Sequence, residues 1–388
     1  MEETKRLMLE HIAEQFAAGA ECPLGEEAAS DNSTEQQSCN LLDVQPYGNG
    51  HINETYLLTY EENGKKSCRI LQKINKTVFP KPEEVMENIV NVTEHLKKKI
   101  LEMGGDTQRE TLNIIPTKDG KTYYLDQDGE YWREYVFVTN ATSYDTVKDK
   151  NDFYQSAVAF GNFQCLLADF PAETLHETIR QFHDTRKRFA DFKKAVDEDV
   201  VKRAAEVEEE IKFVLEREDV ANYFSELLDR GEIPLRVTHN DTKLNNIMID
   251  DASGKGICVI DLDTVMPGLA MFDFGDSIRF GANTAAEDET DLSRVSCSLE
   301  LFECYVDGFL KGCNGRLTPK EVELLPMGAK VMTYECGMRF LTDYLQGDVY
   351  FKTHREKHNL DRCRTQFALV ADMERKWAEM EAIIKKYM

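Results

Sequence analysis

The chain has 388 residues, 41% of them hydrophobic, and a formal net charge of −24. The composition is ordinary for a soluble globular protein, and the length suits one large two-lobed unit or two domains. The acidic charge argues against a broad surface for nucleic acids or anionic membranes. No apolar run approaches the roughly 20 residues of a membrane-spanning helix, and the first residues resemble an amphipathic helix more than a secretory signal. Ten cysteines without a C-x-x-C pair favour a reducing cytoplasm.

The first part of the chain is expected to carry a helix, a polar stretch and then strands. Residues 4–18 have apolar side chains at helical spacing, whereas 20–40 are polar and acidic, which is typical of a linker or surface loop. Three strands are expected at 41–46, 52–60 and 67–74. The pair Asn63-Gly64 predicts a tight turn between the second and the third.

The turn between the first two strands contains Gly48 and Gly50. Glycine lets backbone N–H groups approach a phosphate closely, so this turn is a candidate cover for ATP. The third strand carries Gln72 and Lys73 where kinases place a phosphate-pairing lysine. Lys73 has the charge, but strand alternation sends the two side chains to opposite faces. The sequence leaves open which of them meets ATP.

In a helix at 82–103, Glu87 or Glu94 could pair with Lys73, although a solvated acid is the favoured interpretation of each. Three more strands are expected at 112–116, 122–125 and 130–138, and helices predominate from residue 139 onward. The sequence therefore predicts three parts: residues 1–40, 41–138 and 139–388. In a kinase-like layout, backbone amides from Tyr135 to Val138 would meet the adenine.

The motif that carries the chemistry is His239-x-Asp241-x-Lys243-x-x-Asn246. It is followed by a strand at 247–249, a turn at 251–256, a strand at 257–260 and then Asp261. Antiparallel pairing of these strands brings Asn246 opposite Asp261.

These side chains match the needs of phosphoryl transfer to an alcohol. In that reaction an Asp accepts the hydroxyl proton, while an Asn and a second Asp hold the magnesium bound to ATP. Asp241 is therefore the candidate base, and Lys243 would offset charge on the phosphoryl group. Asn246 and Asp261 are candidate Mg²⁺ ligands, and Asp263 is either a further ligand or a neighbour of the metal.

Other enzyme classes and one non-enzymatic class are alternatives to this interpretation. A protein kinase is disfavoured because no A-P-E follows the loop. A choline kinase would need an aromatic cage for the quaternary ammonium, and the C-terminal part has only scattered aromatic residues. Kinases of methylthioribose or homoserine are further alternatives. A nucleotide-binding pseudokinase is disfavoured by the intact set of Asp241, Asn246 and Asp261.

Several long blocks resemble one family beyond the catalytic motif. They cover residues 47–57, 236–247, 260–268, 272–281, 335–341 and 347–350. On these blocks the chain resembles the aminoglycoside phosphotransferase/choline kinase superfamily, and within it the N-acetylhexosamine 1-kinases. The likeness extends from about residue 41 to the C-terminus. The segment at 20–40 belongs to no motif.

The resemblance implies an α+β, bilobal protein-kinase-like fold, with an antiparallel-sheet N-terminal lobe over ATP and a helical C-terminal lobe for the sugar. It implies Mg²⁺-dependent transfer from ATP to the anomeric hydroxyl of N-acetylglucosamine or N-acetylgalactosamine. The family's base falls on Asp241 and its metal ligands on Asn246 and Asp261. The implied sugar contacts are His51, Asp241, Phe280, Arg339 and Tyr350.

Two sets of residues have a structural interpretation beside the functional one. Asp273, Asp276 and Arg279 could form a buried ion pair that anchors the metal loop. Arg339 could pair along its own helix with Glu335 or Asp343, at i−4 and i+4. Gln72 stands where the wider superfamily often has a basic residue, which leaves the role of Lys73 open.

Overall fold

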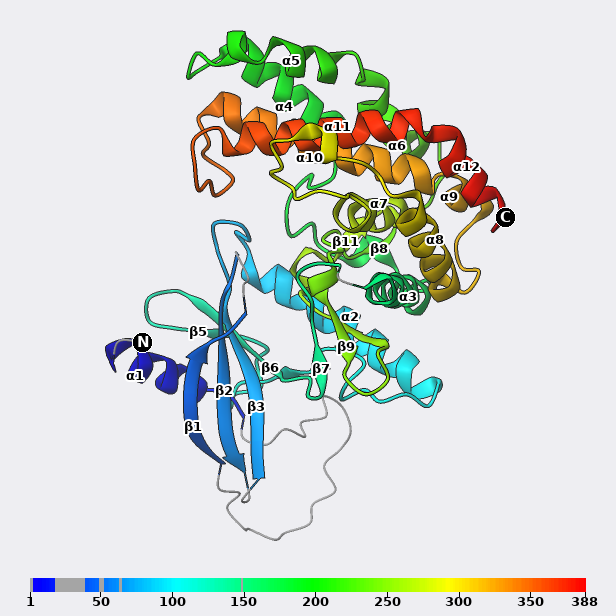
Figure 1. Ribbon diagram of the computed structural model, residues 1–388. Helices are drawn as coiled ribbons and strands as arrows, with labels where there is room; N and C mark the ends of the chain where they lie inside the picture. The colour runs from blue at the N-terminus through cyan, green and yellow to red at the C-terminus, as the bar shows by residue number, and fades with distance from the viewer. Residues whose placement is uncertain (1–2, 18–38, 49–51, 63–64, 148) are drawn as a thin grey trace. The chain divides into compact units, whose positions relative to one another are not determined.

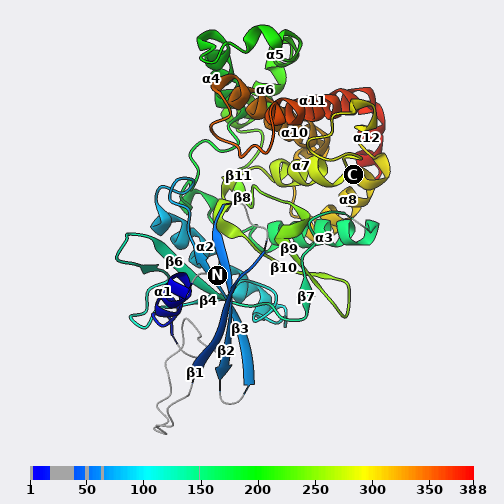
Figure 2. The same cartoon turned by 60° about the vertical axis from the view of Figure 1, so that its left-hand side comes forward.

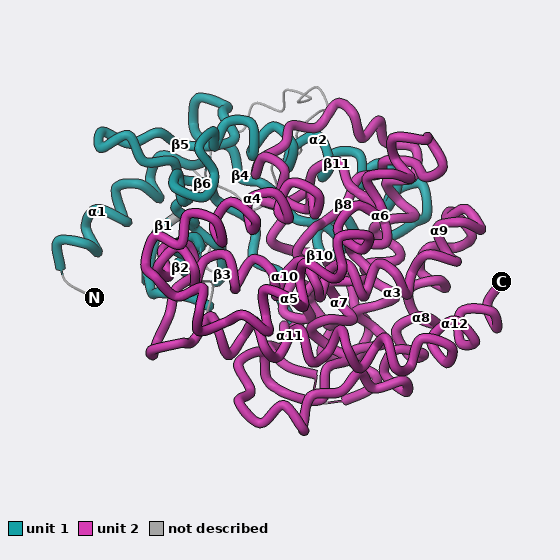
Figure 3. The backbone as a smooth tube through the Cα atoms, turned by 90° about the horizontal axis from the view of Figure 1, so that it is seen from above, with its two compact units in different colours: residues 1–140 teal, residues 141–388 magenta. Residues whose placement is uncertain are grey.

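The computed structural model describes residues 3–17, 39–48, 52–62, 65–147 and 149–388. The chain forms two compact units, Met1–Asn140 and Ala141–Met388 (Figure 3). The three-part division predicted from the sequence stays a prediction. Within the described ranges, no helix is both long and apolar enough to cross a bilayer.

The first unit is built on an antiparallel sheet (Figure 1). Its strands are β1 (Cys39–Pro46), β2 (Glu54–Glu62), β3 (Lys65–Lys73), β4 (Ile114–Ile115), β5 (Tyr124–Leu125) and β6 (Tyr131–Val136). They follow the order β1-β2-β3-β6-β4, with β5 paired to β6. The predicted strands are confirmed, although the last three are shorter than expected.

Helix α1 (Glu3–Ala13) is shorter than the predicted helix at 4–18. Phe16 instead makes an antiparallel bridge with Thr117 and is buried. A residue whose backbone pairs in such a bridge cannot also continue the helix. The stripe of apolar side chains therefore extends further than the helix itself.

The two faces of the sheet have different covers. Leu71 and Trp132 belong to a buried apolar cluster that includes Leu9 and Ile12 of α1. The opposite face carries Arg133, whose Nη1 lies 4.0 Å from the sulfur of Met86 on α2 (Pro82–Glu102). Gln72 is directly opposite Arg133 in the β3–β6 register, so both side chains are on the α2 face.

The second unit is mostly helical (Figures 1 and 2). Its helices are α3 (Lys150–Leu166), α4 (Thr185–Glu198), α5 (Glu208–Leu215), α6 (Glu218–Asp229), α7 (Ala270–Gly281), α8 (Leu299–Cys313), α9 (Pro319–Glu323), α10 (Leu325–Gln346), α11 (His358–Arg375) and α12 (Trp377–Lys385). Two small antiparallel sheets complete it, made by β7 (Ala141–Thr142), β9 (Ile247–Asp250) and β10 (Gly256–Val259), and by β8 (Arg236–Thr238) and β11 (Met266–Gly268).

Helices α7 and α10 pack closely at two glycines. A Cβ added at Gly275 would lie 2.3 Å from the Gly328 carbonyl oxygen, and one at Gly328 would lie 2.3 Å from the Met271 carbonyl oxygen. Only glycine allows so close an approach of two helix backbones. The contact matters for the site because α7 and α10 supply several of its buried charged side chains.

Candidate active site

The catalytic motif lies in a loop between β8 and β9. The predicted strand–turn–strand after it is confirmed: Val259 pairs with Ile247 in the β9–β10 ladder. The Ile260 amide then donates to the Asn246 carbonyl over 2.9 Å. Antiparallel pairing thus places Asn246 beside the backbone that leads directly into Asp261.

Asp241, Lys243 and Asn246 converge in this loop. Lys243 Nζ lies 2.6 Å from Asp241 Oδ1. Asn246 Nδ2 donates to the Asp241 carbonyl over 2.8 Å and to Asp241 Oδ2 over 3.3 Å. The Asp241 side chain remains 24% exposed, so a small molecule can reach it.

The environment favours the carboxylate form of Asp241. Burial raises its pKa, but the charge and the hydrogen bond of Lys243, together with the charge of Arg279, act against that effect. The pKa of Asp241 therefore lies below its ordinary value. A carboxylate that is charged at neutral pH and partly exposed is able to accept a proton from a hydroxyl group.

His239 supports the loop as a neutral ring. Its Nδ1 accepts the Asp241 amide over 3.3 Å, so its Nε2 carries the hydrogen and donates to the Ile260 carbonyl over 2.9 Å. The ring is fully buried, with Phe160 and Phe163 at its edge. It ties the catalytic loop to the segment that enters Asp261.

Asp273 of α7 holds the backbone of the loop. Its carboxylate accepts the His239 amide over 3.0 Å, the Asn240 amide over 2.8 Å and the Gln164 side chain over 2.7 Å. Asn240 has φ +65°, a left-handed conformation that is costly for most residues but more accessible to Asn. These bonds hold the residue before Asp241 in that conformation.

One turn further along α7, Asp276 pairs with Arg279 over 2.9 Å and accepts the Thr242 amide over 3.1 Å. The buried ion pair suggested by the sequence is confirmed. The sequence had predicted that the ion pair anchors the metal loop. The Asp276 carboxylate, however, binds the catalytic loop at Thr242. The i, i+3 spacing on one helix leaves an oxygen of Asp276 free to turn toward that loop.

The candidate metal ligands are oxygen donors of the type that Mg²⁺ prefers. Asn246 uses its Nδ2 as a donor to Asp241, which leaves its amide oxygen for another partner. Asp261 is exposed and has φ +59°, whereas Asp263 is buried. No group of three His, Cys, Asp or Glu side chains in the described ranges could hold a metal by itself. Two carboxylates and an amide fit an ion that also binds nucleotide oxygens, and these metal-binding roles stay predictions.

The candidate sugar contacts fall into two places. Phe280 is 39% exposed, with Lys243 Nζ 5.8 Å from the centre of its ring, so it lies beside the catalytic loop. Arg339 lies among the rings of Phe182, Tyr350 and Phe351, at 5.2–5.8 Å from their centres. His51 and Gly50, the other predicted sugar and phosphate contacts in the glycine turn, lie outside the described residues.

The helix pairing suggested for Arg339 is wrong. The Glu335 carboxylate accepts from His183 and Thr185 instead. The Asp343 carboxylate accepts the Val349, Tyr350 and Phe351 amides. Both acids are therefore occupied by groups outside the helix. Arg339 lies against aromatic rings, and its Nη2 is 3.5 Å from the Tyr350 hydroxyl.

In the first unit, Gln72 and Lys73 have different surroundings. Gln72 Oε1 accepts from Arg133 Nε over 3.0 Å and from Arg133 Nη2 over 2.8 Å. Lys73 Nζ lies 3.5 Å from Glu54 and 3.8 Å from Glu130. The suggested pairing of Lys73 with Glu87 or Glu94 is wrong, because Lys73 is on the face of the sheet opposite to that covered by α2.

The other candidate nucleotide contacts lie at the ends of strands. Gly48 follows β1 with φ +73°, and a Cβ there would meet nothing within 4 Å, so the turn requires glycine for its backbone angle alone. Tyr135 is buried within β6. Within the described part of the chain, the Val138 amide has no backbone carbonyl partner, whereas those of Val136 and Phe137 do. Adenine binding at Tyr135 and Val138 stays a prediction.

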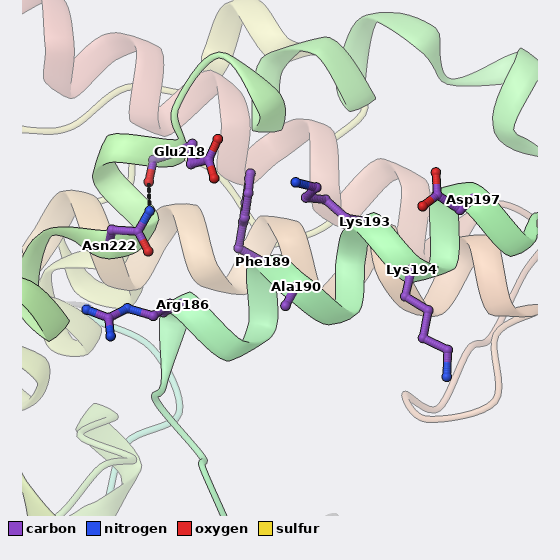
Figure 4. Close-up of a pocket in the computed structure, with 8 residues that line it drawn as sticks. All are labelled: Arg186, Phe189, Ala190, Lys193, Lys194, Asp197, Glu218 and Asn222. Atoms are coloured by element: carbon purple, nitrogen blue, oxygen red, sulfur yellow. Dashed lines mark hydrogen bonds between the residues drawn. The ribbon is translucent and has the colours of Figure 1, made fainter.

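A separate surface pocket of about 410 Å³ lies between α4 and α6 (Figure 4). It is lined by Arg186, Phe189, Ala190, Lys193, Lys194, Asp197, Glu218 and Asn222. None of these residues belongs to the predicted site. Its lining contains basic side chains together with the acidic Asp197 and Glu218. This mixture of charges favours neither anionic nor cationic ligands.

Residues 43–296, more than half of the chain, match the phosphotransferase enzyme family. The chain belongs to this family. The match spans most of the sheet of the first unit, the catalytic loop and α7. Membership establishes phosphotransferase chemistry and leaves the acceptor molecule open.

Solved structures show the same fold at low sequence identity. A choline kinase from Cryptosporidium parvum has TM-score 0.54 and 14% identity, covering 88% of this chain and 91% of its own. An aminoglycoside phosphotransferase from Alicyclobacillus acidocaldarius has TM-score 0.52 and 11% identity, covering 88% and 92%. A spectinomycin phosphotransferase bound to ADP and spectinomycin has TM-score 0.51 and 12% identity, covering 86% and 92%. The predicted kinase-like α+β fold is thereby confirmed.

The two faces of β3 give one testable distinction within this family. If the α2 face meets the phosphates, Gln72→Ala should raise the Michaelis constant for ATP, because it removes the amide oxygen that accepts the Arg133 hydrogen bonds. Lys73→Met, on the opposite face, should then be almost silent. Steady-state kinetics at varied ATP checks this. The reverse result, with the defect carried by Lys73→Met, would assign the phosphates to the α1 face.

Proposed function

We propose that this phosphotransferase moves the terminal phosphoryl group of ATP to the anomeric hydroxyl of an N-acetylhexosamine. The observation that carries the proposal is the convergence of Asp241, Lys243 and Asn246 in the loop beside Asp261. This set matches the parts that phosphoryl transfer to an alcohol needs. The resemblance of the longer sequence blocks to N-acetylhexosamine 1-kinases supports the choice of acceptor.

In the proposed reaction, Asp241 accepts a hydrogen bond from the sugar hydroxyl and takes its proton as the oxygen attacks phosphorus. Lys243, held 2.6 Å from Asp241, keeps that carboxylate in the charged form and offsets negative charge on the phosphoryl group. Asn246 and Asp261 would hold Mg²⁺, with Asp263 as a neighbour or third ligand. The bound ion would supply charge neutralisation at the nucleotide phosphates.

The proposed acceptor site uses Phe280, Arg339 and Tyr350. An exposed aromatic ring beside the catalytic loop suits the apolar face of a sugar ring, and a guanidinium suits hydroxyl and acetamide oxygens. Neither group requires a charged substrate. These contacts favour a neutral, hydroxyl-rich acceptor close to Asp241.

Choline is the main alternative acceptor, because a choline kinase shares the fold. A quaternary ammonium needs a free aromatic cage. The cluster of Phe182, Tyr350 and Phe351 already surrounds the guanidinium of Arg339. A second cation at this place would be repelled by Arg339, so the aromatic cluster favours the sugar over choline.

The position of transfer can be measured directly. Phosphorylation at carbon 1 removes the reducing end of a sugar, whereas phosphorylation at carbon 6 leaves it intact. With N-acetylglucosamine or N-acetylgalactosamine, ATP and Mg²⁺, we expect ADP to form and reducing ends to disappear in equal amounts. The phosphate of the product should be acid-labile.

Choline, methylthioribose and homoserine serve as competing acceptors in the same assay. ADP release with an unchanged reducing end would place transfer on another hydroxyl. Release of ADP with one of the competing acceptors, and none with either sugar, would replace the proposed substrate class while keeping the phosphotransferase chemistry.

A further inference from the structure

His183 links the catalytic loop to a buried carboxylate on α10. Its Nδ1 lies 2.8 Å from Glu335 Oε1, and its Nε2 lies 3.1 Å from the Asn240 carbonyl oxygen. Thr185 donates its hydroxyl to the other Glu335 oxygen over 2.6 Å. The His183 side chain is 8% exposed and that of Glu335 is 1% exposed. The cluster therefore joins three distant segments of the second unit.

The partners of His183 determine its protonation state. A neutral imidazole has a single N–H, so it can donate to one acceptor only. Both nitrogens of His183 face acceptors, a carboxylate and a backbone carbonyl, and both bonds form only if both nitrogens carry hydrogen. His239 differs, because it lies between a backbone N–H and a carbonyl and is satisfied as a neutral ring.

We propose that His183 is a positioning residue of the catalytic loop, held as an imidazolium by Glu335 and donating to the Asn240 carbonyl. The inference rests on the proposed role of Asp241 as the base. It assigns to His183 and Glu335 a part in catalysis without contact with either substrate.

The electrostatics of Glu335 agree with an ion pair. Burial raises the pKa of Glu335, but the charge of His183, its hydrogen bond and the charge of Arg339 outweigh that effect, and the pKa lies below its ordinary value. Arg188 of α4 also acts on this carboxylate. The uncharged rings of Phe182 and Phe272 also lie near the His183 ring, at 4.3 Å and 5.7 Å between centres.

The bond to Asn240 acts on Asp241 through the peptide that the two residues share. Asp273 fixes the amide of Asn240, and the Asn240 side chain donates to the Thr264 carbonyl over 2.9 Å. His183 fixes the backbone carbonyl of the same residue. Since Asn240 is left-handed, loss of this bond should allow the peptide to rotate and move the Asp241 carboxylate.

The protonation state can be tested without any activity measurement. In protein labelled with ¹⁵N-histidine, long-range ¹H–¹⁵N correlations distinguish an imidazolium from the neutral tautomers, and His183→Gln identifies the resonance by its loss. We expect both ring nitrogens of His183 to be protonated at neutral pH. A neutral ring there would overturn the proposal and leave the phosphotransferase reaction untouched.

The positioning role is tested by two variants that differ in reach. The amide nitrogen of Gln extends about as far as Nε2, so His183→Gln keeps an uncharged donor to Asn240. The amide nitrogen of Asn extends only about as far as Nδ1, so His183→Asn loses the donor to Asn240. We expect His183→Asn to lower kcat by about 10²-fold, the cost typical of a misplacement near 1 Å, with the KM for ATP unchanged. We expect His183→Gln to retain most of kcat.

A pH profile separates positioning from simple structural support. If the His183 ring gives up one of its two hydrogens, the other should remain on Nδ1, where it faces the Glu335 carboxylate, and the bond from Nε2 to Asn240 is lost. Wild-type kcat should therefore fall on the alkaline side. Lys243 is not expected to cause this fall, because the charges of Asp241 and Asp276 raise its pKa despite burial, which acts the other way.

Two variants should abolish that alkaline fall. His183→Gln has no group to titrate, and in Glu335→Gln the new amide can donate to Nδ1 and leave the hydrogen on Nε2 for Asn240. His11 is an exposed histidine of α1 and provides the control. The variant His11→Gln should keep the wild-type pH profile. Equal kcat and equal pH profiles in wild type, His183→Asn and Glu335→Gln, at equal thermal stability, would refute the positioning role.

Discussion

Replacing Asp241 with Asn is expected to lower kcat by about 10²–10⁴-fold, the usual cost of removing a general base. Asn keeps the size of the side chain but cannot accept the hydroxyl proton. The bond from Asn246 to the Asp241 carbonyl involves the backbone and should survive. Binding of Mg-ADP, measured by calorimetry, should therefore be close to that of the wild type while turnover is lost.

A matched control exists in the first unit. Asp119 and Lys121 have the same Asp-x-Lys spacing as Asp241 and Lys243, and their charged atoms lie 2.9 Å apart on the surface. Asp119→Asn removes the same kind of ion pair and should leave kcat unchanged. Near-normal turnover in Asp241→Asn would remove Asp241 from the role of base.

The same base has an expected pH signature. Because Lys243 lowers the pKa of Asp241 below its ordinary value, the carboxylate should stay charged to a lower pH than an ordinary Asp does. The acidic fall of kcat/KM should therefore lie at a lower pH than an ordinary Asp would give. Lys243→Met removes the main group that lowers the pKa, so its acidic fall should begin at a higher pH than in the wild type. An unchanged acidic limb would contradict the assignment of Asp241 as the titrating base.

Replacing Asp261 with Ala is expected to weaken Mg²⁺-dependent nucleotide binding more than replacing Asn246 does. A carboxylate brings a full negative charge to a hard cation, whereas an amide brings only a dipole. Loss of an outer-shell partner commonly costs about 10–100-fold in metal affinity, and loss of a direct ligand should cost at least as much. Activity measured against Mg²⁺ concentration should show partial rescue of Asn246→Ala and less rescue of Asp261→Ala.

Asp251 provides the control on the same hairpin. It lies in the turn between β9 and β10 and accepts a bond from Thr142 over 2.8 Å, outside the predicted ligand set. Asp251→Ala should have the Mg²⁺ dependence of the wild type. If all three variants shared that dependence, the metal would have to bind elsewhere.

The arrangement of the catalytic loop could be predicted because its parts are close in sequence. Asp241, Asn246 and Asp261 belong to one loop and one hairpin, whose turn and strand pattern already bring them together. Strand alternation alone likewise predicts that Gln72 and Lys73 lie on opposite faces of the sheet, as the register shows. Such short-range geometry follows from backbone periodicity alone.

The surroundings of those residues could not be predicted in the same way. Which face of β3 each side chain meets depends on where α1 and α2 pack, and Arg133 of β6 reaches Gln72 only across the sheet. The expected helix partners of Arg339 turned out to bind other groups, because helix spacing says which side chains are neighbours but not which competing donors approach from outside the helix.

The sequence by itself determined the phosphotransferase motif, the order of strands and helices, and the kinase-like fold class. Only the tertiary structure decided what holds the motif in place. Asp273 and His183 reach the catalytic loop from α7 and from the segment before α4, and Glu335 reaches His183 from α10. The physical reason is that a buried carboxylate or imidazole must satisfy its hydrogen bonds with whatever groups packing brings near it, and packing is a property of the whole chain.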